Sequence, residues 1–106
     1  TSCTGAWHQG WVVFHDINNN AALDAGETVI LKQPGMPDGF RLTGNSHVSD
    51  YISYMPTGAT EMTSGAFQSG TLTVCRQSYE EYGARRIVIS RTGRPRIETT
   101  TLASCP

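Results

Sequence analysis

The sequence is short of several features that mark common classes of protein. It contains no apolar run near the ~18 residues that a membrane-spanning helix requires and no secretory leader, so the chain as given is expected to be a soluble fragment or a mature protein. Lysine occurs once, at Lys32, whereas Gly, Ser, Thr and Asn are abundant. This turn-rich composition argues against a helical bundle. Residues 1–106 are expected to form a single domain with a real hydrophobic core.

Cysteine is also scarce, and its spacing argues against zinc. The three cysteines are Cys3, Cys75 and Cys105, and none belongs to a CxxC pair. Two interpretations are open: three reduced thiols in a core, or an exported domain with one disulfide and one unpaired cysteine. We favour a Cys75–Cys105 disulfide, because a cysteine one residue from the C-terminus can pin a fraying end. Closing that loop would stabilise the fold by ~3–4 kcal/mol.

Motifs that carry catalysis are missing as well. The three histidines, His8, His15 and His47, belong to no nucleophile elbow, HExxH sequence or comparable constellation. A lone histidine near a strand is more often a packed or surface residue than a catalyst. We therefore expect no enzymatic activity, no cofactor and no metal centre. Trp7 and Trp11 can stack on nucleic-acid bases, but on an early strand they are predicted to belong to the core.

What the sequence does contain is a β pattern. Short runs of branched and aromatic residues alternate with turn signals rich in Gly, Pro and Asn. The segments predicted to be strands are 10–15, 27–31, 40–42, 51–55, 70–75, 86–90 and an extended stretch from residue 94. One helical turn is predicted around "QSYEEY", residues 77–82. Many short strands with frequent turns predict a mainly β fold of two packed antiparallel sheets.

The segment "DINNNAALDAGE", residues 16–27, joins the first two predicted strands. Its oxygen-bearing side chains have the ligand spacing of a calcium-binding EF-hand loop: Asp16, Asn18, Asn20, Asp24 and Glu27. An EF-hand loop, however, lies between helices and needs Gly at its sixth position, where this chain has Ala21. Asn and Asp also suit the end of a hairpin, because they tolerate left-handed dihedrals. We favour a structural hairpin loop, with calcium binding as the alternative.

Basic residues are distributed unevenly along the chain. Through Cys75 there are two basic residues and six acidic ones, a net charge of −4; the rest of the chain has six and three, a net charge of +3. All six basic residues of the second part are arginines: Arg76, Arg85, Arg86, Arg91, Arg94 and Arg96. Arginine forms planar, forked hydrogen bonds to phosphate and stacks on bases, which lysine cannot do. The second part of the chain is therefore a candidate for binding a polyanion.

The arginines are densest in the stretch "SRTGRPR". Gly93 permits a tight turn, and the proline that follows Arg94 favours an extended conformation there. In that conformation Arg94 and Arg96 point to the same side, ~6.6 Å apart along the strand. Backbone phosphates are a natural target for such a pair. The alternative is a solvated turn whose arginines form ion pairs with Glu98 or Glu80.

Taken in order, these segments resemble the GspH/FimT family of minor type IV pilins and type II secretion pseudopilins. The residues that carry the resemblance are "GWVVFHDINNNAALDAGETVI", "GFRLTGN", "YISYMPTG", "GTLTVC" and "RRIVISRTGRPR", with "SCP" at the end. The resemblance implies a membrane-anchored pilin with a leader, a long apolar N-terminal helix and a periplasmic β-domain of two sheets. Leader and helix are absent from this sequence, so the partner of Cys3 is expected upstream of Thr1. The resemblance also supports the Cys75–Cys105 disulfide and a hairpin role for the Asn-rich loop.

Within this family, FimT-like members resemble DNA receptors of natural transformation. Their C-terminal G-R-x-R motif maps here onto Gly93, Arg94, Pro95 and Arg96. The first hypothesis is therefore sequence-independent DNA binding at a pilus tip, with Arg94 and Arg96 on phosphates. The arginines expected to flank this pair, or to add further contacts to the DNA backbone, are Arg91, Arg85 and Arg86. Because neighbours on a strand face opposite ways, Arg85 and Arg91 share one face and Arg86 lies on the other.

The second hypothesis is a filament-building role without DNA, as in FimU-like and GspH-like members that prime or cap the filament. Under both hypotheses the partners are other minor and major pilins, and the missing N-terminal helix lies in the inner membrane. The location is the cell envelope, with inner membrane and periplasm before assembly and the extracellular pilus afterwards. The DNA hypothesis requires that the guanidinium groups of Arg94 and Arg96 be neither locked into carboxylate partners nor covered by the Cys105 tail.

Overall fold

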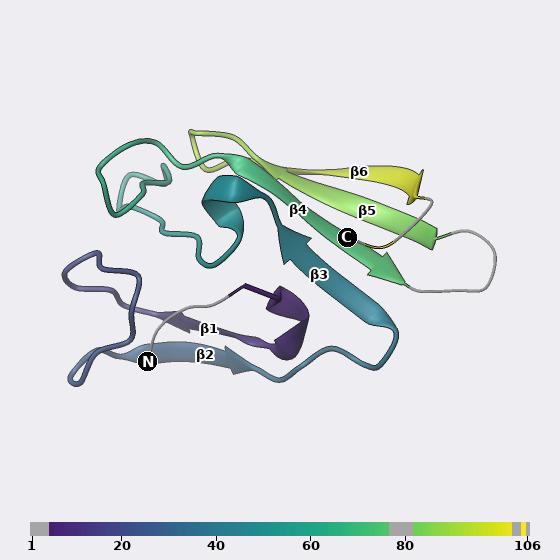
Figure 1. The fold of residues 1–106 in the computed structure, drawn as a ribbon. Coiled ribbons are helices and arrows are strands. Elements are labelled where there is room, and N and C mark those ends of the chain that lie inside the picture. The colour runs from purple at the N-terminus through teal and green to yellow at the C-terminus, as the bar shows by residue number, and fades with distance from the viewer. Residues whose placement is uncertain (1–4, 77–81, 103–104, 106) are drawn as a thin grey trace.

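The computed structural model describes residues 5–76, 82–102 and 105. Within these residues the fold is mainly β, with two antiparallel sheets, as the sequence predicts (Figure 1). The small sheet pairs β1 (Trp11–Phe14) with β2 (Val29–Gln33). The large sheet contains, in spatial order, β3 (Phe40–Gly44), β4 (Gly70–Arg76), β5 (Tyr82–Ile89) and β6 (Pro95–Leu102). The two short 3-10 helices are η1 (Trp7–Gln9) and η2 (Ser46–Val48).

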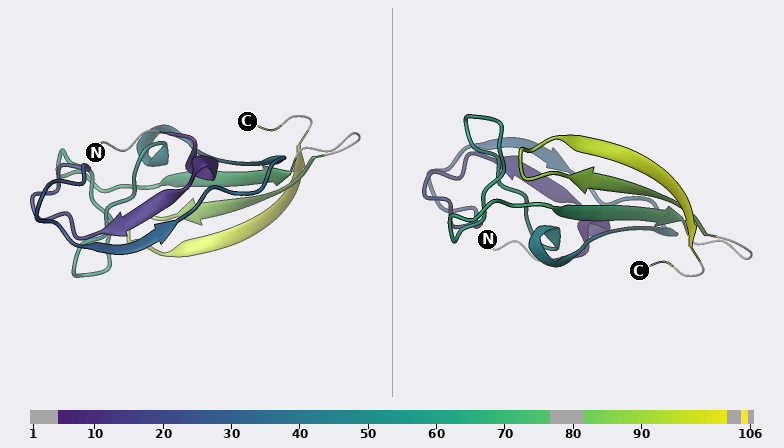
Figure 2. Two further views of the ribbon diagram at one scale, coloured as in Figure 1. Left: turned by 90° about the horizontal axis from the view of Figure 1, so that it is seen from below. Right: turned by 90° about the horizontal axis from the view of Figure 1, so that it is seen from above.

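The two sheets lie in separate layers with the core between them. In Figure 2 the β1–β2 pair lies in front of the large sheet when seen from below and behind it when seen from above. The centre of the core consists of four buried residues, Leu42, Val48, Leu72 and Ile89. Partly buried residues that pack against this cluster include Trp7, Trp11 and Ile87. The two tryptophans therefore belong to the core, as predicted.

Six of the seven predicted strands are present, and the prediction for residues 51–55 is wrong. This segment has only an isolated bridge, between Tyr54 and Thr60. Two of its backbone groups bond to residues 59–61: the Glu61 N–H donates to the Ser53 carbonyl, and the Met55 N–H donates to the Ala59 carbonyl. Two others bond to the fully buried side chain of Gln68: Ser53 N–H donates to Gln68 Oε1 at 2.9 Å, and Gln68 Nε2 donates to the Tyr51 carbonyl at 2.8 Å. The helical turn predicted at 77–82 falls on residues outside the described ones, except that β5 already begins at its last residue.

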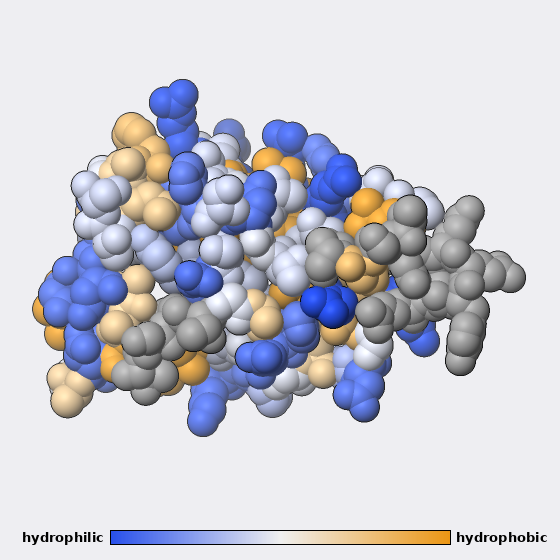
Figure 3. Space-filling view, in the orientation of Figure 1, coloured by the Kyte–Doolittle hydropathy of each residue, from blue (hydrophilic) through white to orange (hydrophobic). Residues whose placement is uncertain are grey.

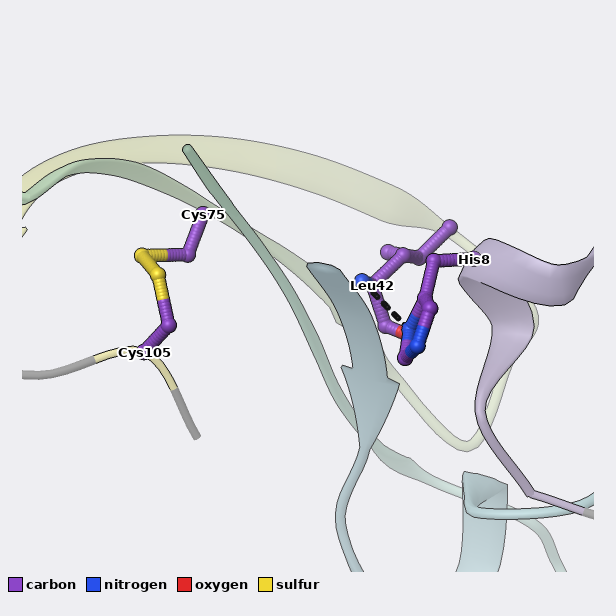
Figure 4. The surroundings of a disulfide bond; sticks show 4 residues. All are labelled: His8, Leu42, Cys75 and Cys105. Atoms are coloured by element: carbon purple, nitrogen blue, oxygen red, sulfur yellow. Dashed lines mark hydrogen bonds between the residues drawn. A yellow bond between two sulfur atoms is a disulfide. The ribbon is translucent and has the colours of Figure 1, made fainter. Parts of the chain in front are cut away.

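The predicted Cys75–Cys105 disulfide is present, with Cα atoms 5.7 Å apart (Figure 4). Cys75 lies on β4 and is only 1% exposed, so the bond ties the C-terminal end to the interior of the large sheet. Cys3 lies outside the described residues. Figure 4 also shows His8, whose Nδ1 accepts a hydrogen bond from the Leu42 N–H at 3.2 Å on the free edge of β3. His8 is therefore a packed structural residue.

Part of the small sheet leaves apolar surface uncovered. Val29, Ile30 and Leu31 of β2 are all exposed, Ile30 at 69%. A groove of about 1140 Å³ separates this sheet from residues 50–56, and its lining includes Trp11 and Phe14. No helix in the described part of the chain is long and apolar enough to cross a membrane. The groove and the exposed strand thus give the small sheet an apolar surface.

Candidate functional site

The β5–β6 hairpin carries most of the arginines predicted to bind DNA, and its tip is a tight turn. Gly93 N–H donates to the Ser90 carbonyl at 2.9 Å, and Ser90 N–H donates to the Arg94 carbonyl at 3.2 Å. Gly93 has a φ of 82°, the left-handed conformation that closes a three-residue hairpin loop. The Ser90 hydroxyl, which shares a hydrogen bond with Thr92 Oγ1, also accepts one from the Arg94 N–H at 3.3 Å. The backbone on both sides of the turn is therefore held by hydrogen bonds.

The tip is also anchored to a distant part of the chain. A Cβ added at Gly93 would collide with the Gly58 carbonyl oxygen and would lie 3.1 Å from the Tyr54 ring. The Tyr54 hydroxyl donates a hydrogen bond to the Gly93 carbonyl at 3.3 Å. The sequence predicts a glycine turn here, but nothing in it signals this contact across the fold. The arginines next to Gly93 therefore project from a fixed turn.

The two arginines of the predicted DNA-binding pair differ in their surroundings. Arg94 is exposed, and within the described residues its guanidinium group has neither an ion-pair nor a hydrogen-bond partner. Arg91 lies in the turn itself and is also exposed, and its guanidinium group has no ion-pair or hydrogen-bond partner among the described residues. Arg96 is bound to Glu98: its Nη2 and Nε lie 3.0 and 3.2 Å from the same carboxylate oxygen, Oε1. The requirement for free guanidinium groups is therefore met at Arg94 and not at Arg96.

The other arginines lie on opposite faces of the large sheet, as strand alternation predicts. Arg86 and Arg96 line one hollow on the face turned away from the core. Arg85 lies on the same face of β5 as Ile87 and Ile89, which pack toward the core, but its own side chain is exposed. In Figure 3, hydrophilic residues project from the edge of the molecule along β5 and β6. The fold thus places Arg86 beside Arg96 and Arg85 on the other side of the sheet.

The Asn-rich loop joins β1 to β2 as a hairpin connection. Asp16 accepts hydrogen bonds from the backbone N–H groups of Asn20 and Ala21, at 3.3 and 2.9 Å. Glu27 accepts two more backbone hydrogen bonds at the far end of the loop. Among the described residues there is no group of three or more acidic, His or Cys side chains placed to hold a metal ion. In this structure the carboxylates of Asp16 and Glu27 hold the turns of the loop through their hydrogen bonds to the backbone.

Comparison with known proteins decides the family. A family model described as type II transport protein GspH matches residues 1–93. The chain belongs to the GspH family. Neither the comparison with curated proteins nor that with solved structures gives a match.

Membership of the GspH family places the chain among the minor pilins and pseudopilins. These are structural, non-catalytic proteins of the cell envelope that associate with other pilins or pseudopilins. The two-sheet fold agrees with a pilin-like domain. The match ends at Gly93, before Arg94 and Arg96, so the part of the motif that would distinguish a FimT-like member lies beyond the matched residues.

Proposed function

We propose that the protein is a minor type IV pilin that binds DNA through its β5–β6 hairpin, without sequence preference, for DNA uptake in natural transformation. The main support is the exposed guanidinium group of Arg94, which has no partner within the described residues and projects from an anchored turn. A fixed turn loses little conformational freedom on binding, so more of the electrostatic gain is kept. Arg91 flanks Arg94, and Arg86 with Arg96 continues the contact on the outer face. Arg85, on the other face, is left out.

The ion pair between Arg96 and Glu98 weakens this surface without removing Arg96 from it. The two side chains are 68% and 44% exposed. An exposed pair of this kind contributes ~0.2–1 kcal/mol and is screened by salt. A phosphate group can accept two parallel hydrogen bonds from a guanidinium group, which is a stronger arrangement. DNA can therefore compete with Glu98 for Arg96, at a lower net affinity than two free arginines would give.

The test removes two charges from the hairpin and, in a matched control, two charges from elsewhere. Arg94→Ala with Arg96→Ala should abolish binding of a short DNA duplex in a fluorescence anisotropy titration. Lys32→Ala with Arg85→Ala should keep it, although both double variants change the formal net charge from −1 by the same two units. For the wild type, phosphate contacts by three of the four arginines proposed to bind DNA predict a slope of log Kobs against log salt of about −2.7.

Equal binding by the two double variants would reject the hairpin as the site. Thermal unfolding of each variant provides the control for folding, because none of the four side chains is buried. A loss of binding that accompanies a loss of the folded state would not count as support.

The second candidate function is a filament subunit that makes pilin contacts and does not bind DNA. The observations that favour it are the Arg96–Glu98 ion pair and the uncovered apolar residues of β2. In that case the arginines would form ion pairs at subunit contacts. Capture of the protein by other minor pilins, together with no DNA-induced NMR chemical-shift change at low salt, would support this function over the first.

The proposed location follows from the proposed role. The domain would be held at the inner membrane by an N-terminal helix, facing the periplasm, and would move to the pilus tip on assembly. The upstream sequence is the direct check, because a pilin requires a leader followed by an apolar helix of about 20 residues or more. An upstream sequence without such a segment would contradict the anchored form.

A further inference from the structure

A hollow lies on the outer face of the large sheet, behind the hairpin tip. Its volume is about 530 Å³, and its lining includes Thr43, Thr71, Thr73, Arg86, Arg96 and Glu98. The strand register explains this set, because it aligns polar residues across all four strands. One cross-strand row consists of Thr43, Thr73, Arg86 and Glu98. The next row consists of Thr71, Val88 and Arg96. The outer face is therefore polar and cationic at this point.

Glu98 lies between the two arginines of the hollow. It is paired with Arg96 two residues earlier on β6, and its cross-strand partner on β5 is Arg86. Side chains that oppose each other in an antiparallel pair have Cβ atoms about 5 Å apart. Arg86 nevertheless forms no ion pair with any described residue. Two guanidinium groups thus border one carboxylate, and counting only the described residues the hollow has a net charge of +1.

We propose that this hollow is a second phosphate-binding position for the DNA strand held at the hairpin tip, and that the Glu98 carboxylate occupies it in the free protein. The inference rests on the proposed DNA-binding function and adds one residue, Glu98, that lowers the affinity for DNA. Carboxylate and phosphate oxygens accept the same forked hydrogen bonds from a guanidinium group. On binding, Arg96 exchanges Glu98 for a phosphodiester oxygen, and the released carboxylate returns to water. Glu98 is therefore an internal competitor of the DNA.

The lining of the hollow suits a phosphodiester chain. The hydroxyl groups of Thr43 and Thr73 have no hydrogen-bond partner within the described residues and can donate to phosphate oxygens. Val88 supplies an apolar part of the surface, against which a deoxyribose ring can lie. The excess positive charge matches the single negative charge of each phosphodiester group. Charge complementarity therefore favours a DNA strand that continues from Arg94 over the outer face.

The test titrates single variants with a short fluorescein-labelled DNA duplex at low and at moderate salt. Glu98→Gln should tighten binding about two- to fivefold, the range that an exposed ion pair is worth. Arg86→Gln should weaken binding by a similar factor, and the gain from Glu98→Gln should shrink in its presence. The slope of log Kobs against log salt should steepen in Glu98→Gln, by less than the ~0.9 of a full additional phosphate contact.

Two matched controls separate the hollow from a general effect of charge. Arg85→Gln removes the same charge as Arg86→Gln from the neighbouring residue on the opposite face, and should leave binding within about twofold of the wild type. Asp38→Asn removes a negative charge from an exposed turn after β2 and should also have little effect. Thermal unfolding of all four variants should match the wild type.

The outcomes distinguish this inference from the proposed function. In one outcome, Glu98→Gln and Arg86→Gln change the DNA affinity no more than their controls, Asp38→Asn and Arg85→Gln. In the same outcome, Arg94→Ala still weakens binding. The hollow is then unused, and only the hairpin tip binds DNA. If neither the wild type nor Glu98→Gln binds DNA at low salt, the proposed function is rejected and this inference with it.

Discussion

Gly93 satisfies two separate constraints at the tip of the β5–β6 hairpin. Its φ of 82° belongs to the left-handed region, where a Cβ is unfavourable. Its Cα also approaches the Gly58 carbonyl so closely that no Cβ fits. The glycine of the G-R-x-R sequence is therefore explained by backbone geometry alone, and a binding role is left to the arginines that follow it.

Replacing Gly93 should cost more stability than replacing another glycine of the same φ. Gly39 has a φ of 91°, with nothing within 4 Å of an added Cβ, so Gly39→Ala adds only backbone strain, about 1 kcal/mol. Gly93→Ala adds the collision with Gly58, for a total of about 2–4 kcal/mol. Urea denaturation of the two variants measures the difference. Equal losses would show that the contact with Gly58 relaxes freely.

Strand alternation correctly placed Arg85 and Arg86 on opposite faces of β5, because it depends only on the period of an extended chain. It does not apply to Arg91, which was predicted to share the face of Arg85 but lies in the turn beyond the end of β5 at Ile89. The sequence alone did not identify the partner of Arg96, since Glu98 and Glu80 were both candidates. Glu98 is two residues from Arg96 on the same strand face, and the structure joins these two. The hollow behind the tip was also not predicted, although the alternating threonines Thr71 and Thr73 hint at an outward polar face.

At the scale of the element, most strands follow from local pattern, and the one failure has a tertiary cause. Residues 51–55 have a strand-like composition, but their backbone hydrogen bonds are divided between residues 59–61 and the side chain of Gln68, so no regular strand pairing forms. The Nε2 of Gln68 also donates to the His47 carbonyl, at 2.7 Å. This one buried amide therefore joins η2 to residues 51–53, a contact that local periodicity cannot reveal.

The disulfide links the large sheet covalently to the C-terminal end of the chain, and its removal should lower the free energy of unfolding. It joins residues 30 apart in sequence, for which the chain-entropy model gives about 3–4 kcal/mol. Adding a reductant should therefore lower the free energy of unfolding of the wild type by about this amount. Cys105→Ser should show the same loss and no further change with reductant. A wild type indifferent to reductant would contradict this account.

At the scale of the whole molecule, the two sheets present different surfaces. The large sheet turns a polar, arginine-bearing face outward, whereas the small sheet exposes branched apolar residues on β2. Solvent-exposed apolar patches of this kind mark contact sites for other proteins. The protein therefore has a polar, arginine-bearing surface and an apolar surface on opposite layers of the fold.

Ile30 should matter for association and not for folding. It is 69% exposed, so Ile30→Thr should change the free energy of unfolding by less than about 0.5 kcal/mol. The same change at Ile89, which is 4% exposed, should cost about 2 kcal/mol or more. Pull-down with other minor pilins should show weaker capture of Ile30→Thr than of the wild type. Undiminished capture would exclude this part of β2 from the subunit contact.

The disulfide between Cys75 and Cys105 also determines how the large sheet would bear force. An edge strand such as β6 has a neighbour on one side only, so it is the easiest strand to separate from the sheet. Cys105, which follows β6 in the chain, is bonded to Cys75 on the interior strand β4. A force applied at Cys105 would therefore act directly on β4 as well as on β6.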